Sequence, residues 1–179
     1  KIDKTIITIP CNTLSPLTRQ LEKLLKKPEE LTDLLEKEKN NFSNSDIESI
    51  LSKHKLIFKT VPEGVINILG QKGYKKILPL GTCEIFNIYN DACNNSDTKM
   101  QVIQTDDESS ELVLKAISYS ISNSEKKLSE TKNKLKKNLT KYINDKDVAI
   151  IEACTDLDMN LGMDSSSLFA DYLAHYIYN

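Results

Sequence analysis

Short apolar runs rich in β-branched residues alternate along this chain with longer segments whose apolar residues recur at helical spacing. Runs of the first kind predict buried strands, and the helical spacing predicts amphipathic helices. The predicted strands are residues 5–10, 75–80, 99–103 and 147–152. The predicted helices are residues 15–26, 62–73, 107–122, 125–144 and 165–178, with another from the turn at 81–82 to about residue 93. This alternation is typical of an α/β fold whose mostly parallel sheet is covered by helices on both faces.

The ends of several helices carry their own signals. Ser15 is expected to cap the first helix, and Pro16 suits its first turn. The acidic run at 106–108 is expected to start another helix, where negative charge is favoured. Residues 29–55 are charged and rich in asparagine, and we expect them to form a surface insertion of two short amphipathic helices.

Composition limits the class of protein. A chain of 179 residues suits one domain or two small lobes, and 39% hydrophobic residues are enough for a core. The net charge of −2 argues against a nucleic-acid partner. No apolar run is long enough to cross a membrane, and no segment reads as a signal peptide. The first residue is Lys1, directly before a predicted strand, so we expect an N-terminal portion to be missing from the chain.

Two cysteines occupy matching positions at strand ends. Cys11 follows the first predicted strand and precedes Asn12 and Thr13, whereas Cys154 follows the last and precedes Thr155. The carboxyl ends of such strands lie at the ligand crevice of an α/β fold, so we expect both thiols to face one pocket. Backbone N–H groups there would bind an anion and would favour a thiolate. Two thiols on opposite faces of a carbon can remove a proton and return it on the other side, which is racemase chemistry without a cofactor.

The remaining candidates are weaker. Cys83 and Cys93 lie ten residues apart and are interpreted as core thiols that cannot share a ligand. His54 and His175 are interpreted as surface or packing residues. The four cysteines form no C-x-x-C pair, so free thiols in a reducing cytosol are the simplest expectation, and no metal site is predicted.

In its motifs the chain resembles the cofactor-independent aspartate/glutamate racemase family, specifically the aspartate racemase branch. The segment Pro10-Cys11-Asn12-Thr13 matches that branch's first cysteine motif, and Cys154-Thr155-Asp156 resembles its second. Between them, residues 77–82 followed by Tyr89 resemble the family's strand, turn and helix, and Asp164 matches an aspartate before the last helix. The resemblance covers nearly the whole chain in order, apart from 29–55.

This resemblance implies two pseudo-symmetric lobes with the active site between them. The lobes would be residues 1–65 with 161–179, the first being incomplete, and residues 66–160. Cys11 and Cys154 would be the catalytic pair, and Asn12, Thr13 and Thr155 would hold the carboxylate of a small acidic amino acid, aspartate or glutamate. The resemblance implies no cofactor and no metal, and it leaves open a homodimer.

Departures from the family pattern support a second hypothesis. Ala153 and Asp156 replace the usual glycine and glutamate around the second cysteine, and Ser122 stands where a substrate-binding lysine is usual. The chain would then be a non-catalytic relative that binds a small carboxylate or keeps only the fold. A third hypothesis is isomerisation or decarboxylation of a small diacid by the same cysteine pair.

Overall fold

The computed structural model describes residues 4–27, 55–157 and 159–178. Nearly all of the predicted insertion at 29–55, and His54 with it, lies outside these residues. Contacts divide the chain into two units: Lys1–Ile9 with Leu14–Thr60, and Pro10–Thr13 with Val61–Asn179. The predicted division into lobes, 1–65 with 161–179 and 66–160, stays a prediction; the boundary between the two units lies at residue 60, and the second unit includes the terminal helix.

The first unit contains a two-stranded parallel sheet and a helix. Strand β1 (Lys4–Ile7) pairs with β2 (Lys55–Phe58), with Ile6 opposite Ile57. The described side chains of β1 are half-buried rather than fully buried as its apolar run suggested. Strand β2 was not predicted, because four residues are too few to show a periodicity.

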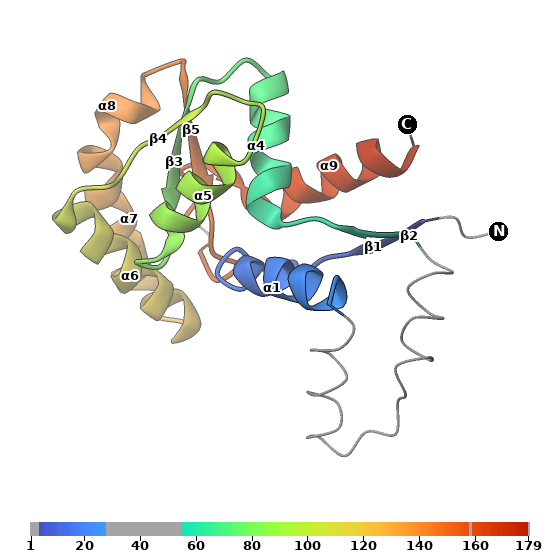
Figure 1. Ribbon diagram of the computed structural model, residues 1–179. Helices are drawn as coiled ribbons and strands as arrows, with labels where there is room; N and C mark the ends of the chain where they lie inside the picture. The colour runs from blue at the N-terminus through green and yellow to red at the C-terminus, as the bar shows by residue number, and fades with distance from the viewer. Residues whose placement is uncertain (1–3, 28–54, 158, 179) are drawn as a thin grey trace. The chain divides into compact units, whose positions relative to one another are not determined.

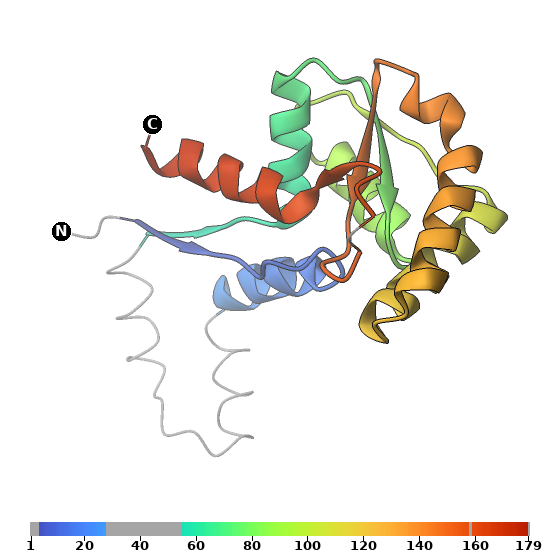
Figure 2. The ribbon, with the colours of Figure 1, turned by 180° about the vertical axis from the view of Figure 1, so that it is seen from behind.

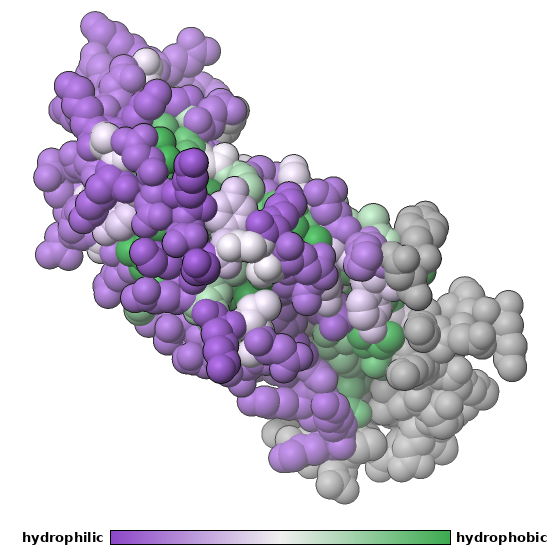
Figure 3. All heavy atoms as spheres, turned by 90° about the horizontal axis from the view of Figure 1, so that it is seen from above, coloured by the Kyte–Doolittle hydropathy of each residue, from purple (hydrophilic) through white to green (hydrophobic). Residues whose placement is uncertain are grey.

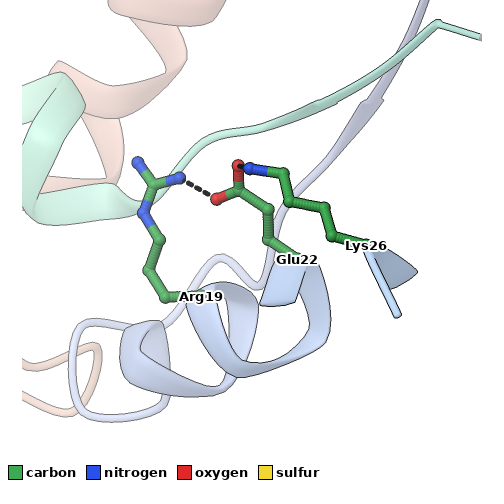
Figure 4. A network of polar contacts seen from close by, with 3 residues as sticks. All are labelled: Arg19, Glu22 and Lys26. Carbon is green, nitrogen blue, oxygen red and sulfur yellow. Dashed lines mark hydrogen bonds and ion pairs between the residues drawn. The ribbon is translucent and has the colours of Figure 1, made fainter. Parts of the chain in front are cut away.

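Helix α1 (Ser15–Leu25) confirms the prediction for 15–26, with Pro16 in its first turn. The predicted cap was wrong: Leu14 is the N-cap residue and makes no side-chain cap hydrogen bond, while Ser15 is the first helical residue. On the surface of α1, Glu22 accepts hydrogen bonds from Arg19 and from Lys26 (Figure 4). The Lys26 hydrogen bond is the main reason that the pKa of Glu22 is lowered. Exposed i,i+3 and i,i+4 pairs of this kind stabilise a helix by only ~0.3–0.5 kcal/mol each.

The second unit is built on a four-stranded sheet in the order β4-β3-β5-β6, in which every pair is parallel. Its strands are β3 (Lys76–Leu80), β4 (Gln101–Val102), β5 (Val148–Glu152) and β6 (Met163–Asp164). Its helices are α4 (Val61–Gln71), α5 (Ile85–Asn94), α6 (Asp107–Ile121), α7 (Glu125–Asn138), α8 (Thr140–Ile143) and α9 (Ser165–Tyr178). The predicted α/β class with parallel sheets flanked by helices is confirmed.

The two faces of this sheet bury separate clusters of side chains. Ile77 and Ile151 pack with residues of α4, α5 and α9, whereas Leu78, Leu80 and Ile150 pack with residues of α6 and α7. Successive residues of a strand point to opposite faces, so each central strand contributes to both clusters. Figures 1 and 2 show β3 and β5 between these two groups of helices.

Three local features explain where helices of this unit begin and end. The predicted helix 125–144 is interrupted at Leu139, whose side chain is 1% exposed and lies in the core. Helix α4 ends at Gln71, and Gly73 follows in the left-handed conformation with φ of 86°, which glycine adopts at little cost. At Asp106, the predicted acidic start of α6 is confirmed, because its carboxylate accepts a hydrogen bond from the Ser109 N–H at 2.7 Å.

Hydrophilic side chains predominate on the face shown in Figure 3, with apolar residues in separate patches between them. Among the described residues, no helix combines the length and the apolar character needed to span a membrane.

Candidate functional site

The carboxyl ends of β3 and β5 lie side by side in the second unit. Leu80 and Glu152 are partners in the register, and the Ala153 N–H donates to the Leu80 carbonyl at 2.8 Å. Cys154 therefore lies two residues past the end of β5, at the edge of the sheet where ligands bind in α/β folds. The short segment Pro10–Thr13, which includes Cys11, belongs to this same unit.

Cys11 and Cys154 both belong to the second unit. Both side chains are half-buried, and Cys11 is close enough to Cys154 for its charge to raise the pKa of the Cys154 thiol. That the two thiols face one pocket stays a prediction.

Burial is the main reason that the pKa of Cys154 is raised. A hydrogen bond from the backbone N–H of Asp156 lowers this pKa, while the Asp156 carboxylate and Cys11 raise it further. The expectation of a thiolate favoured at this strand end was wrong for Cys154. The physical reason is local: β5 leads into turns at 155–156 rather than into a helix N-terminus, and desolvation disfavours the anion.

Asn12 is 2% exposed and has a partner at each end of its amide. Its Nδ2 donates to Ser165 Oγ at 2.9 Å, and its Oδ1 accepts from the Tyr89 hydroxyl at 2.8 Å. Tyr89 is fully buried, and this burial raises the pKa of its phenol, so the hydroxyl stays a donor. The three side chains connect the Cys11 segment to α5 and to the start of α9.

Thr13 and Thr155, the other predicted substrate-binding residues, are both exposed. Each follows its cysteine within two residues, so their hydroxyls are accessible beside the two thiols. Asn12 differs from them, because its amide is buried and already bonded through both Nδ2 and Oδ1.

Sequence reasoning missed the role of Glu152 at the end of β5. Its carboxylate is 5% exposed and accepts hydrogen bonds from the backbone N–H groups of Met159, Leu161 and Gly162. An acidic residue that ends an otherwise apolar, fully buried strand was the signal that could have identified it. Asp164, singled out by the family resemblance, accepts from the N–H groups of Ser166 and Ser167 and so caps α9.

A pocket of about 240 Å³ lies at the carboxyl ends of β3 and β4, between α5 and α6. Thr82 lines it with a buried hydroxyl that has no hydrogen-bond partner, and Cys83 lies beside it. Neither Cys11 nor Cys154 lines this pocket. Cys83 is exposed and precedes α5, so its interpretation as a core thiol was wrong; Cys93 is buried in α5 as predicted.

No group of three or more histidine, cysteine or acidic side chains in the described part of the chain is arranged to hold a metal ion. His175 lies on α9 with an exposed side chain, in agreement with its interpretation as a surface residue.

Comparison with solved structures finds a likeness to the aspartate racemase of Picrophilus torridus. The two share 20% sequence identity with a TM-score of 0.49, and the match covers 68% of this chain and 54% of that protein. The chain thus spans about half the length of that racemase. Neither a protein-family model nor a curated protein matches the sequence. The functional argument therefore depends on the residues of this chain.

Proposed function

We propose that this protein is an amino-acid racemase that uses Cys11 and Cys154 as a pair of proton-transfer groups. The observation that supports this most directly is that two half-buried thiols belong to the same unit and that the charge of Cys11 contributes to the raised pKa of Cys154. The motifs around both cysteines also resemble those of aspartate racemases. The proposed substrate is accordingly a small acidic amino acid, aspartate or glutamate.

The reaction needs only the two thiols and the substrate. One cysteine, as thiolate, takes the Cα proton and becomes a thiol, while the electron pair stays on the substrate as a carbanion-like species. The second thiol then donates its proton to the opposite face of Cα and becomes a thiolate. Atoms and charges balance, and the two cysteines have exchanged roles, so the next turnover runs in the other direction.

The surroundings of Cys154 support its role as the initial acid. Because burial, Asp156 and Cys11 raise its pKa, Cys154 is a thiol near neutral pH. The proton donor is then in place before the substrate binds. Cys11 takes the complementary role of base in the same turnover.

The neighbouring polar residues fit two tasks. The exposed hydroxyls of Thr13 and Thr155 are suited to donate hydrogen bonds to the substrate α-carboxylate. Asn12 is held by Tyr89 and Ser165, so it fixes the Cys11 segment and offers one further N–H to the substrate. Fixed donors of this kind stabilise developing negative charge more effectively than water does.

The test is to compare Cys11→Ser and Cys154→Ser with the unchanged protein on D- and L-aspartate and glutamate. Each variant should lose net racemisation, because a serine hydroxyl is far too weak an acid to replace a thiol. Each should still exchange the Cα hydrogen of one enantiomer with deuterated solvent, since one thiol remains. Chiral chromatography measures the first quantity, and mass spectrometry measures the second.

Cys83→Ser is the matched control, because it makes the same chemical change at an exposed cysteine. It should leave both activities unchanged. If the unchanged protein neither racemises nor exchanges deuterium, the non-catalytic carboxylate-binding hypothesis replaces this one. Loss of activity in Cys83→Ser would instead show that the active site lies at the pocket beside β3. Consumption of a diacid without racemisation would favour the third hypothesis.

A further inference from the structure

A buried acidic side chain connects the strand that precedes Cys154 to the loop that follows it. Glu152 is the last residue of β5, and its backbone is in register with Leu80 on β3 and Asp164 on β6. Acidic side chains are rarely so buried unless their oxygens are satisfied. Here the partners are backbone N–H groups of the loop from 153 to 162.

Both carboxylate oxygens of Glu152 take part. Oε2 accepts from the Met159 N–H at 3.0 Å, and Oε1 accepts from the N–H groups of Leu161 at 2.7 Å and Gly162 at 3.2 Å. An ionised carboxylate only accepts hydrogen bonds, so it matches three donors that converge from one side. The loop that begins with Cys154 is thereby closed onto its own strand.

The far end of this loop is equally constrained. A Cβ atom on Gly162 would lie 2.4 Å from the carbonyl oxygen of Ile150, so the loop returns in direct contact with the backbone of β5. It continues into β6, and Ser165 follows at once. The Ser165 hydroxyl accepts the hydrogen bond from Asn12, the neighbour of Cys11.

We infer that Glu152 is a positioning residue that holds the Cys154 loop and, through Ser165 and Asn12, keeps the two thiols in a fixed relation. In this role it acts on the thiols through the loop that it holds. The catalytic role of the two thiols rests on the proposed function, but the role of Glu152 in fixing the loop is independent of it. Proton transfer between fixed groups is sensitive to displacements of about 1 Å, which can cost ~100-fold in rate.

The first test needs no substrate and no variant. In native-state hydrogen exchange, the amides of Met159, Leu161 and Gly162 should be protected, although they lie in a loop. In Glu152→Gln they should exchange faster, because an amide NH₂ group would face one of the three donors. Fast exchange of these amides in the unchanged protein would overturn the inference.

The second test measures the thiol itself. In a Cys83→Ser/Cys93→Ser background, alkylation of Cys154 by iodoacetamide is followed against pH by peptide mass spectrometry. Glu152→Gln should react several-fold faster at pH 7, with the midpoint moved to lower pH, because a loosened loop exposes the thiol. Glu152→Asp keeps the charge but shortens the side chain, so it should show a smaller change. Glu111→Gln is the matched control at an exposed glutamate and should change nothing.

The kinetic test distinguishes positioning from substrate binding. Glu152→Gln should lower kcat for racemisation by ~10–100-fold with KM changed less than about threefold. If the protein proves not to be a racemase while exchange and alkylation change as expected, the proposed function fails and the role of Glu152 stands. If Glu152→Gln folds with the loop amides still protected and the Cys154 profile unchanged, the inference is wrong whatever the activity. If Glu152→Gln does not fold, hydrogen exchange and Cys154 alkylation of Glu152→Asp and of the wild-type protein test the inference instead.

Discussion

Removing the Tyr89 hydroxyl tests whether the buried hydrogen bonds of Asn12, the neighbour of Cys11, stabilise the protein. Tyr89→Phe deletes one oxygen and keeps the ring, so the packing of this fully buried side chain is preserved. The hydrogen bond of 2.8 Å to Asn12 Oδ1 is lost, and that oxygen remains buried without this donor.

The size of the effect follows from this geometry. A buried acceptor left without its partner costs about 1–3 kcal/mol, and a central value near 2 kcal/mol applies where both groups are enclosed as here. For a chain of this length, each kcal/mol corresponds to about 2–4 °C in the melting temperature. Tyr89→Phe should therefore lower the melting temperature by about 4–8 °C, and the urea midpoint should fall with an unchanged m value.

Far-UV circular dichroism is the appropriate assay, because the chain has no tryptophan to report unfolding by fluorescence. Tyr142→Phe removes the same atom from a half-buried tyrosine of the same unit and should cost less than about 0.5 kcal/mol. Ser165→Ala removes the other partner of Asn12, and the double variant should show coupling, because both changes act on one amide. A loss below about 0.5 kcal/mol in Tyr89→Phe would refute the hydrogen bond and with it the rigidity assigned to the Cys11 segment.

Two further predictions concern stability. Gly162→Ala should destabilise the protein by at least the ~1–3 kcal/mol typical of overpacking, since the new Cβ would lie 2.4 Å from the Ile150 carbonyl oxygen. Gly73→Ala should cost only about 1–2 kcal/mol, because Gly73 has a φ of 86° and open space around it. If urea unfolding shows that Gly73→Ala is the more destabilising of the two, the close approach at Gly162 is contradicted. Asp106→Ala should cost about 1 kcal/mol at pH 7 as a lost N-cap. The Ser109 N–H lowers the folded-state pKa of Asp106. The stability that Asp106 contributes is therefore present above its unfolded pKa of about 3.9 and is lost as pH falls through the lower folded value. The difference in unfolding free energy between Asp106→Ala and the wild-type protein should disappear there, and a difference that stays constant down to pH 2 would show that the charge plays no part.

Local signals in the sequence determined the elements of the second unit. The apolar runs at 75–80 and 147–152 have the length and β-branched content of buried strands, and both formed within a residue of the predicted bounds. Periodicity located the helices because one apolar face must meet the sheet. It could not show that Leu139 ends α7, because a core leucine fits a helix and a helix break equally well.

The sequence also placed Cys11 and Cys154 after apolar, strand-like runs, but it did not show that the preceding strands belong to different sheets, with β1 paired to β2 and β5 paired to β3 and β6. The sequence alone did not determine the state of these thiols or what holds them. The pKa of Cys154 depends on desolvation and on charges that folding assembles around it. The partners of Asn12 lie 77 and 153 residues away, at Tyr89 and Ser165.

Glu152 illustrates the same limit at short range. Its position at the end of an apolar strand was visible, but three backbone donors reach it only because the following loop turns back on β5. Such contacts depend on the path of the backbone in three dimensions, which no spacing of residue types encodes. The local sequence pattern therefore determined the helices and strands of the second unit and where its strands end. The chemical environment of the candidate site was determined by the tertiary structure.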